Sequence, residues 1–406
     1  MSALVAAGMT GYVPGATLCV NPGGTGGCYA TINAAVTAAA NHDIVRVAAG
    51  TYKEDVVIGR PLSLVGSGSQ STIIDAAGMA NGVYIDGLDH LGLNNVLVAA
   101  FTVRNANFEG ILITNASNSV IYNNRVINNN KALDITTFSC PGLPAFETAE
   151  SEDCGEGIHL VGADHTTVQN NVVQNNAGGI LMSDETAPTH DNLISGNTVA
   201  NNPYDCGITM ASHPPASGTA PFGVIHNTIL NNQSTHNGYQ VPGAGAGIGI
   251  FTFLPGGTVT GNVVVGNVVM NNGLPGVTFH AHGPQENLND NVIAGNTISG
   301  NGPDTEDAAT PGPTGINVYG LSAIMGTIIS QNVIDGEMID IAVNTPAEVQ
   351  AHFNNFHDAT YGIDNLGTGI ANGTENWWGC SGGPGATGCA TTGGLVRFAP
   401  WLTNPF

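Results

Sequence analysis

The sequence predicts an all-β solenoid, in which short strands follow one another around successive coils and the coils stack into one body. The first observation is a strand pattern that recurs along the chain: glycine, then isoleucine or valine, then any residue, then another apolar residue. Residues two apart in a strand point to the same face, so each copy has an apolar face and an outward face. The pattern occurs at Gly110–Ile113, Gly157–Leu160, Gly179–Met182, Gly207–Met210, Gly247–Ile250, Gly276–Phe279 and Gly315–Val318.

The second observation is an asparagine at a fixed corner of the repeat, next to a strand rich in valine or isoleucine. Such corners occur at Asn124, Asn171, Asn197, Asn262 and Asn296, and the last two are 34 residues apart. An asparagine amide can bond the backbone of a tight turn, and stacked amides can bond one another from coil to coil. A coil of this length cannot bury its apolar face alone, so the coils must stack. We therefore expect these asparagines to be structural.

The N-terminal part is predicted to lead into the coils through one amphipathic helix. Residues 1–42 comprise a lead-in rich in glycine and proline and a helix over residues 30–41. Ile32, Ala35 and Val36 lie on one face of that helix at helical spacing. Strands are then expected at Asp43–Val47, Asp55–Ile58 and Leu62–Val65, with a turn at Gly50–Tyr52.

All three tryptophans fall near the C-terminus. Trp377, Trp378 and Trp401 lie within 25 residues. Bulky aromatic side chains suit the open end of a solenoid, because the last coil has no neighbour to cover its core. The expected single domain over residues 1–406 divides into residues 1–42 (lead-in and helix), 43–370 (coils) and 371–406 (C-terminal cap).

Charge and composition exclude several classes of partner. The 406 residues include 30 acidic but only 7 basic ones, a net charge of −23. Such a chain disfavours binding to nucleic acid or to an anionic membrane surface. No stretch is long and apolar enough to cross a membrane, so we expect no membrane insertion. Low total charge fits an extracellular setting, and Ser2–Gly8 is interpreted as the remnant of a removed signal peptide.

Seven cysteines suggest an exported protein. Six of them form three local pairs, each closing a short loop rich in glycine, proline or polar residues. The expected disulfides are Cys19–Cys28, Cys140–Cys154 and Cys380–Cys389. Cys206 is left over and is expected to be buried. The alternative is that all seven are unpaired small residues.

The chain resembles a known superfamily through three features. They are the segment Asp43–Gly66 after a helix, the repeated Gly-Ile and Asn coils, and Asn376–Gly379 followed by Gly383–Pro384. These features resemble the right-handed parallel β-helix superfamily, with its pectate-lyase-like fold and its bacterial β-helix repeat proteins. The resemblance implies a right-handed parallel solenoid with an N-terminal capping helix and an aromatic-rich C-terminal cap. Members include polysaccharide lyases, glycoside hydrolases, epimerases, tailspikes and adhesins, so function stays open.

Signatures of individual enzyme families are absent. The polygalacturonase-like set with Asn-Thr-Asp and Gly-His-Gly does not occur, nor does the epimerase-like Asp-Pro-His. No lysine or arginine lies between Lys131 and Arg397, which disfavours a lyase that uses basic residues. The resemblance implies a substrate groove along one sheet, walled by long turns. Insertions occur at Thr136–Glu156, Asp184–Asn192, Ser212–Phe222, Gln233–Gly245, Gly283–Asn289 and Gly302–Thr314.

Period-2 alternation predicts two columns of outward residues on the repeated strands. The first column is His159, Leu181, Thr209, Gly249, Thr278 and Asn317. The second column is Val161, Ser183, Ala211, Phe251, His280 and Tyr319. In the second column Phe251 and Tyr319 flank His280, which predicts a platform for stacking a sugar.

Acids in neighbouring coils are candidates for catalysis. Adjacent coils are about 5 Å apart, so acids in two coils can match the carboxyl separations of glycosidases. The leading pair is Asp184 or Glu185 with Asp205. The alternative is that these acids are solvated loop residues.

His280 and His282 share one face of a strand and are a second catalytic candidate. They are expected to act in acid/base chemistry or, with Glu286 or Asp304, to bind a metal. The alternative is a pair of hydrogen-bonding surface histidines. The expected substrate-binding residues are His159, His213, Phe251, Glu286, Asn317 and Tyr319.

No cofactor is expected apart from a structural Ca²⁺ at Asp304, Glu306 and Asp307, for which a solvated acidic loop is the alternative. The predicted function is hydrolysis of an extracellular polysaccharide, at the cell surface or beyond it after bacterial-type secretion. The alternative is a non-catalytic adhesive or filament-forming surface protein, which would include self-association. A third hypothesis is a polysaccharide lyase that uses histidine and tyrosine.

Overall fold

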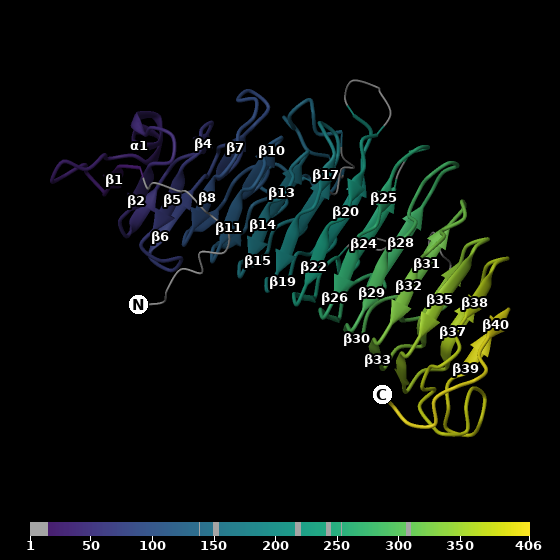
Figure 1. Ribbon diagram of the computed structural model, residues 1–406. Helices are drawn as coiled ribbons and strands as arrows, with labels where there is room; N and C mark the ends of the chain where they lie inside the picture. The colour runs from purple at the N-terminus through teal and green to yellow at the C-terminus, as the bar shows by residue number, and fades with distance from the viewer. Residues whose placement is uncertain are drawn as a thin grey trace.

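A computed structural model describes residues 15–137, 139–148, 154–215, 221–240, 245–252, 254–305 and 310–406. Over these residues the chain winds through three long sheets in turn, and equivalent positions of successive coils stack (Figure 1). The strand pairs of the described residues are parallel, as in Ile111–Thr114 beside Ile158–Val161. The all-β solenoid predicted from the sequence is therefore confirmed.

Sheet A contains the valine- and isoleucine-rich strands that precede the asparagine corner. In the described residues it has 14 strands. They are β1 (Thr17–Val20), β2 (Ile44–Val47), β5 (Ser63–Gly66), β8 (Leu97–Ala99), β11 (Val120–Tyr122), β14 (Thr167–Gln169), β18 (Leu193–Ser195), β22 (Thr228–Leu230), β26 (Val263–Val265), β29 (Val292–Ala294), β32 (Ile328–Ser330), β35 (Glu348–His352), β38 (Ile370–Asn372) and β40 (Val396–Arg397).

Sheet B follows the corner, and within the described chain it has 11 strands. They are β3 (Gly50–Tyr52), β6 (Thr72–Asp75), β9 (Thr102–Arg104), β12 (Arg125–Ile127), β15 (Val172–Gln174), β19 (Thr198–Ala200), β23 (Gln233–Thr235), β27 (Val268–Met270), β30 (Thr297–Ser299), β33 (Val333–Asp335) and β36 (Asn355–His357). A short sheet D, at the corner where the chain leaves sheet C, contains β17 (Thr189–His190), β21 (Val224–Ile225) and β25 (Val259–Thr260).

Sheet C contains the Gly-Ile strands and, over the described residues, has 12 strands. They are β4 (Val56–Ile58), β7 (Val83–Asp86), β10 (Ile111–Thr114), β13 (Ile158–Val161), β16 (Ile180–Ser183), β20 (Ile208–Ser212), β24 (Ile248–Thr252), β28 (Val277–Ala281), β31 (Thr314–Gly320), β34 (Ile339–Asn344), β37 (Tyr361–Asn365) and β39 (Thr391–Gly393). The leading glycine is required by close packing. At Gly110, a Cβ atom would lie 2.2 Å from Cγ1 of Val126 and 2.7 Å from the carbonyl of Gly157.

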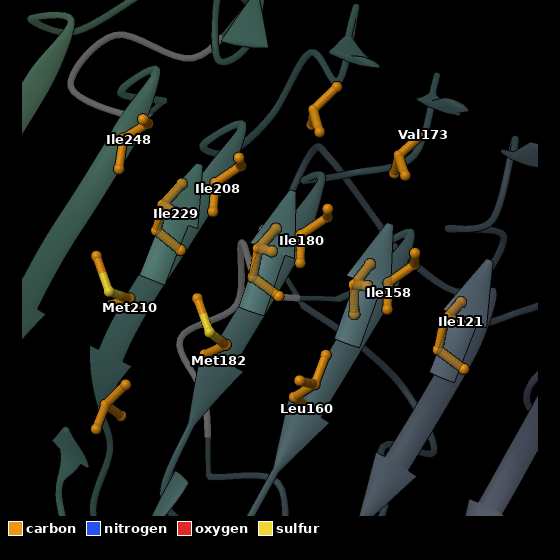
Figure 2. Packing of buried hydrophobic residues seen from close by; sticks show 14 of the residues in the cluster. Ile121, Ile158, Leu160, Val173, Ile180, Met182, Ile208, Met210, Ile229 and Ile248 are labelled. Carbon is orange, nitrogen blue, oxygen red and sulfur yellow. The ribbon is translucent and has the colours of Figure 1, made fainter. Parts of the chain in front are cut away.

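The core lies between the sheets and consists of stacked rows of apolar side chains. Figure 2 shows Ile158, Ile180 and Ile208 in such a row, which the register of the strands places at equivalent positions. These side chains are fully buried. Each buried isoleucine contributes roughly 1.5–3 kcal/mol relative to an exposed one, so every additional coil extends the favourable burial.

The corner asparagines form ladders, as predicted. In the ladder between sheets A and B, the backbone and side-chain amides of Asn197 donate to Oδ1 of Asn232 at 2.9 and 3.0 Å. The Asn197 side chain also donates to the carbonyl of Val168 at 2.9 Å. The members of this ladder are Asn124, Asn171, Asn197, Asn232, Asn267, Asn296, Asn332, Asn354 and Asn376.

A helix and a disulfide lie at the N-terminal end. The helix α1 (Ile32–Ala38) begins after Thr31, whose side chain accepts from the amide of Ala34, and the Glu54 carboxylate accepts from the first two helix amides. The predicted turn at Gly50–Tyr52 is wrong. These residues form β3, because they pair in parallel with β6 and the Tyr52 ring is buried.

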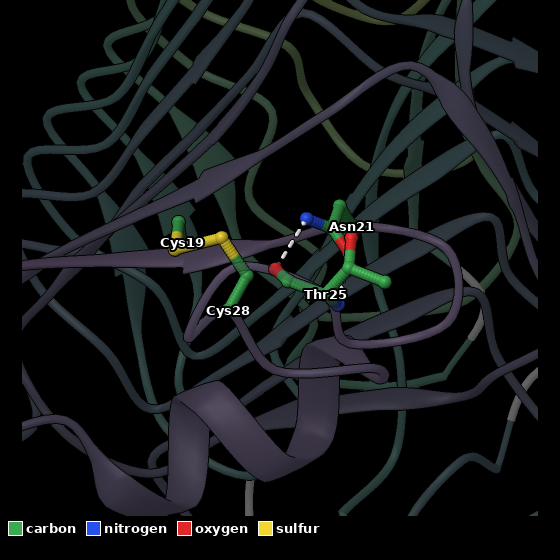
Figure 3. Close-up of a disulfide and its surroundings, with 4 residues drawn as sticks. All are labelled: Cys19, Asn21, Thr25 and Cys28. Atoms are coloured by element: carbon green, nitrogen blue, oxygen red, sulfur yellow. Dashed lines mark hydrogen bonds between the residues drawn. A yellow bond between two sulfur atoms is a disulfide. The ribbon is translucent and has the colours of Figure 1, made fainter.

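The three predicted disulfides are present, and Cys206 is free and buried as expected. Figure 3 shows Cys19–Cys28, with Cα atoms 4.7 Å apart. In the same loop the Asn21 amide donates to the carbonyl of Thr25, and the Thr25 backbone amide donates back to Asn21 Oδ1. The loop is thus closed by a covalent bond and by two hydrogen bonds.

The aromatic residues of the C-terminal part pair separately. Trp378 is fully buried and lies 5.1 Å from the ring of Phe356, whereas Trp401 is partly exposed and lies 6.4 Å from Phe398. The division of the chain into lead-in, coils and cap stays a prediction. In the described part of the chain, no helix has the length and apolar character needed to span a membrane.

Candidate functional site

The outer face of sheet C presents the two predicted columns of residues. His159 pairs with Leu181, and His280 lies between Phe251 and Tyr319 in the register of the strands. Most of these side chains are nevertheless buried, and Phe251 and Tyr319 are only partly exposed. Loops must therefore cover much of this face.

Those loops come from both edges of sheet C. Insertions lie before β13, β24 and β31, where the chain arrives from sheet B, and after β16, β20 and β28, where it leaves. The insertion before β13 also crosses the face, because the Thr148 hydroxyl donates to the carbonyl of Pro214, which follows β20. This crossing explains why the residues beneath it are shielded from solvent.

Beneath that insertion lies a group of buried ionisable side chains, which we call the acid cluster. It consists of Glu109, Glu147, Glu156, His159, Glu185 and His213, each at most 6% exposed. Nδ1 of His213 lies 2.9 Å from a carboxylate oxygen of Glu185, and Nε2 of His159 lies 2.7 Å from the Ser183 hydroxyl. The cluster therefore joins both edges of the sheet across β13 and β16.

Within the acid cluster the carboxyl groups have opposite pKa shifts. Burial alone would raise the pKa of Glu185, but the imidazoles of His213 and His159 outweigh it and hold the pKa at about 2. Burial and the charge of Glu185 raise the pKa of Glu109 to about 8. Burial, with the neighbouring carboxylates, raises the pKa of Glu147 to about 10. One ionised carboxylate thus lies among carboxyl groups that hold protons at neutral pH.

The predicted pair of Asp184 or Glu185 with Asp205 comes from opposite ends of neighbouring strands. Asp184 accepts from the Ser212 hydroxyl and from the amides of His213 and Gly223, at 3.0, 2.8 and 2.5 Å. It therefore anchors the loop after β20. Asp205 lies on the other edge, where its charge raises the pKa of Glu156 after the larger effect of burial. A catalytic role for these acids stays a prediction.

A second group, which we call the histidine platform, lies on β24, β28 and β31 and in the loops beside them. It consists of Phe251, His280, His282, Asp304 and Tyr319. The His280 ring centroid is 5.0 Å from that of Phe251, 5.9 Å from that of Tyr319 and 5.2 Å from that of His282. Phe251, His282 and Tyr319 keep part of their surface exposed. The rings are therefore available to a ligand, unlike the acid cluster.

Carboxyl groups reach the two histidines from loops at both edges of sheet C. From the loop before β31, Oδ2 of Asp304 lies 2.5 Å from Nε2 of His280 and accepts from the Asn317 side chain at 3.1 Å. From the loop after β28, Glu286 accepts from the amide of Gly283 at 2.7 Å and lies near His282. Burial raises the pKa of Glu286 above its ordinary value.

The predicted calcium ligands divide between described and undescribed residues. The Asp304 carboxylate takes part in the hydrogen bonds to His280 and Asn317. Glu306 and Asp307 lie outside the described residues. The calcium site and the expected absence of a cofactor both stay predictions.

Three acid-cluster residues were missed by the sequence reasoning: Glu109, Glu147 and Glu156. Two of them shared a signal, since Glu109 and Glu156 each directly precede a Gly-Ile strand, at the same position of successive coils. A repeated acid at a repeated position predicts a stacked carboxyl pair. Glu147 lies in the insertion before β13, and no periodic pattern marks it.

Sequence comparison matches the chain to the family described as "Right handed beta helix region", over residues 66–234 and 153–376. Comparison with curated protein sequences gives no significant match. Among solved structures, ORF18 of Geobacillus virus E2 is 14% identical with a TM-score of 0.54, covering 87% of this chain and 62% of that one.

Two further structures share the fold. The catalytic unit of the thermostable GH87 α-1,3-glucanase from Streptomyces thermodiastaticus strain HF3-3 is 15% identical with a TM-score of 0.50, covering 92% of this chain and 66% of that one. DFA-IIIase from Arthrobacter chlorophenolicus A6, solved without its lid, is 12% identical with a TM-score of 0.55, covering 95% and 99%. This chain spans less than two thirds of the viral protein and of the glucanase unit. Because the family match extends over more than half of its length, the chain belongs to the right-handed β-helix family.

Proposed function

We propose that this protein is a carbohydrate-active β-helix protein that binds a polysaccharide on the outer face of sheet C and hydrolyses it at the histidine platform. The single observation that carries the proposal is His280, which lies between partly exposed aromatic rings and is bonded to a buried carboxylate. Aromatic surface with a few fixed polar groups is the usual lining of a small-molecule or sugar site. Phe251 and Tyr319 would contact the faces of sugar rings.

Glu286 and Asp304 supply the two carboxyl groups that glycoside hydrolysis needs. Glu286 would act as the general acid that protonates the leaving oxygen, since burial raises its pKa and its Oε1 has no hydrogen-bond partner among the described residues. His280 and Asp304 would take the proton from the attacking water. The 2.5 Å contact between them supports a shared role in holding that proton.

The first rival is a non-catalytic surface that binds the same glycan. One observation favours it: Asp304 and Glu286 are only 1% and 5% exposed, whereas Phe251, His282 and Tyr319 are more accessible. A polysaccharide could stack on the rings without its glycosidic bonds reaching the carboxyl groups. A lyase using His280 and Tyr319 is the third hypothesis, because their rings lie 5.9 Å apart.

We also propose an extracellular or cell-surface location, which three disulfides support because such bonds persist in oxidising environments. The helix α1 and the residues around the buried Trp378 are proposed to cap the two ends of the solenoid. Self-association stays a further hypothesis, and no nucleic-acid partner is proposed for so acidic a chain.

The test is a panel of neutral and acidic polysaccharides incubated with the wild-type protein. Reducing ends and the ultraviolet absorbance of unsaturated products are recorded together. We expect reducing ends without absorbance, and their loss in Glu286→Gln and His280→Ala. The matched control is His357→Ala, which changes a partly exposed histidine on sheet B and should act like wild type.

The outcomes separate the three hypotheses. Ultraviolet absorbance from unsaturated products would show that the protein is a lyase and not a hydrolase. Binding to a polysaccharide without any product would favour the non-catalytic surface. Hydrolysis that survives unchanged in both Glu286→Gln and His280→Ala would overturn the assignment of the site.

A further inference from the structure

The acid cluster contains three side chains arranged like the ligands of a metal ion. One oxygen each from Glu109 and Glu147 and one nitrogen from His159 all lie within 4.8 Å of one another. The three residues are 0%, 6% and 1% exposed. They come from three places in the chain: the turn before β10, the insertion before β13, and β13 itself.

The same three residues carry buried atoms that lack hydrogen-bond partners. In the described residues no partner is found for either carboxylate oxygen of Glu109, for Oε1 of Glu147 or for Nδ1 of His159. The backbone amides of Glu109 and Gly155 lie close enough to the Glu109 carboxyl group to lower its pKa. Neither amide forms a hydrogen bond of normal geometry with it. A buried polar atom without a partner costs about 1–3 kcal/mol, so several of them together need an explanation such as an ion.

Two carboxyl groups are also stacked at this point. Glu109 and Glu156 occupy equivalent positions in successive coils, which are about 5 Å apart. At the next coil this position is Gly178, where a Cβ atom would lie 2.3 Å from the Glu156 carboxylate. The glycine leaves room for the carboxyl group, and adjacent ionised carboxylates are unfavourable without protons or a cation.

We propose that Glu109, Glu147 and His159 form a binding site for one divalent metal ion of the first transition row. Zn²⁺ and Mn²⁺ are the ions that fit these ligands. The site goes beyond the proposed hydrolase function, because it uses no residue of the histidine platform. Glu156 lies beside it as a further acidic group.

The ligand chemistry selects the class of metal. Ca²⁺ and Mg²⁺ prefer sites made of oxygen atoms, whereas an imidazole suits zinc and iron, and carboxylates suit manganese. Bonds of about 2.0–2.2 Å place tetrahedral ligand atoms roughly 3.4 Å apart. The three atoms lie within 4.8 Å of one another, so each pair needs to close by about 1.4 Å at most on binding. Glutamates bind a metal as carboxylates, so the ion would compete with protons for the side chains of Glu109 and Glu147.

The ion would join the insertion before β13 to the sheet. Glu147 lies seven residues after the disulfide-bonded Cys140, and Thr148 next to it reaches the loop after β20. A metal bond from Glu147 to His159 would fix this segment against the outer face of sheet C. The site therefore acts as a clamp that positions the wall of the face where the glycan is proposed to bind.

A second, more exposed group of side chains serves as the control for metal binding at the surface. His165, His190 and Asp191 also come within ligand distance of one another, but they are more exposed. Nδ1 of His165 and Nδ1 of His190 each already contact a neighbouring carboxylate, at 2.7 and 2.8 Å. Substituting these histidines removes the surface group and leaves the buried site intact.

The experiment uses the full chain, stripped of metal by a chelator and titrated with Co²⁺ while its visible absorption is recorded, followed by Zn²⁺ competition. We expect saturation at one ion per chain and at least about tenfold weaker binding in Glu109→Gln and His159→Gln. The His165→Gln/His190→Gln variant should bind like wild type. Hydrogen exchange of the wild-type segment 139–148 should slow when Zn²⁺ is added, which tests the clamp without any variant.

Three results would overturn the proposal. One is a wild-type titration without a saturable signal at one ion per chain. Another is loss of that signal in the His165→Gln/His190→Gln variant, which would assign it to the surface group. The third is unchanged hydrogen exchange in residues 139–148 on addition of saturating Zn²⁺. None of these results bears on hydrolysis at the histidine platform, so the two proposals fail separately.

Discussion

A second asparagine ladder follows sheet B, and Glu337 ends it. Its asparagines are Asn129, Asn176, Asn202, Asn237, Asn272 and Asn301. Both the backbone and the side-chain amide of Asn301 donate to Oε1 of Glu337, at 2.9 and 3.0 Å. Burial raises the pKa of Glu337 to about 7, although these bonds lower it. A carboxyl group whose pKa is higher in the folded state stabilises the fold below its unfolded value of about 4.3, and that stability is lost as the pH rises towards 7.

Glu337→Gln removes this pH dependence and keeps the acceptor for Asn301. The difference in free energy of unfolding, variant minus wild type, should therefore increase by on the order of 2 kcal/mol from pH 5 to pH 8, because only the wild type loses stability over this range. Urea unfolding at both pH values measures it. The control is Asp358→Asn, an exposed carboxyl in sheet B's last corner, which should show no such gain. Equal differences at both pH values would contradict the assignment of Glu337.

The sequence predicts individual contacts correctly where they follow from the two-residue period of a strand. The columns that bring Phe251, His280 and Tyr319 together follow from strand alternation, and the register confirms them. The contacts of Asp304 with His280 and of Glu147 with His159 come from insertions that cross the sheet. Such insertions have no repeat, so their path cannot be predicted from the period of the coils.

The asparagine ladders act as elements in their own right, because each member serves its neighbours on both sides. Oδ1 of Asn232 accepts two hydrogen bonds from Asn197, while its side-chain amide donates to Asn267 and to the carbonyl of Ile194. Asn232→Ala leaves these buried groups without partners. We expect the free energy of unfolding to fall by about 3 kcal/mol or more.

Chemical denaturation of Asn232→Ala measures this loss, with Gln233→Ala as the neighbouring exposed control. The control should change stability by less than about 0.5 kcal/mol. If both variants unfold at the same denaturant concentration as wild type, the ladder would not stabilise the coils in the way proposed.

Element-level prediction succeeded for the repeats and failed at the edge of the solenoid. All seven Gly-Ile stretches form strands of sheet C, because glycine at the first position is fixed by close packing. The turn predicted at Gly50–Tyr52 is a strand in the structure, and a short strand near the end of a solenoid has few repeats to identify it. Whether α1 and Trp378 act as caps stays a prediction.

At the scale of the whole molecule, the outer face of sheet C holds two clusters of side chains, one after the other along the axis of the solenoid. The acid cluster occupies β13 and β16 with their flanking loops, and the histidine platform occupies β24, β28 and β31. The family and the parallel stacking were predictable from the repeat. The closing of loops over the face was not, because it depends on contacts such as that between Thr148 and Pro214.

The acid cluster gives the metal-free protein a distinctive pH dependence. Burial lowers the pKa of His159 to about 4, so its imidazole is neutral in the folded chain from pH 6.5 to pH 8. In the unfolded chain it loses its remaining proton over this range, which opposes the fall in stability by less than about 0.5 kcal/mol. Glu109 and Glu147, with pKa values raised to about 8 and about 10, still bind protons only in the folded state. The free energy of unfolding should therefore fall by at least about 2 kcal/mol from pH 6.5 to pH 8.

Thermal and urea unfolding in the presence of a chelator measures that slope. Repeating it with saturating Zn²⁺ should flatten the slope, because bound carboxylates no longer carry protons. Glu109→Gln should also reduce the slope in chelator. A metal-free protein whose stability rises over this range would contradict the protonation states assigned to the acid cluster.

The most direct test of the central claim is binding of the wild-type protein to an array of polysaccharides, compared with Phe251→Ala and Tyr122→Ala. Phe251 lies on the histidine platform, whereas Tyr122 is an exposed ring on sheet A. The account predicts that wild type binds at least one glycan, that Phe251→Ala binds it at least about tenfold more weakly, and that Tyr122→Ala is unchanged. Equal binding by Phe251→Ala, with its fold intact, or no binding by wild type, would contradict it.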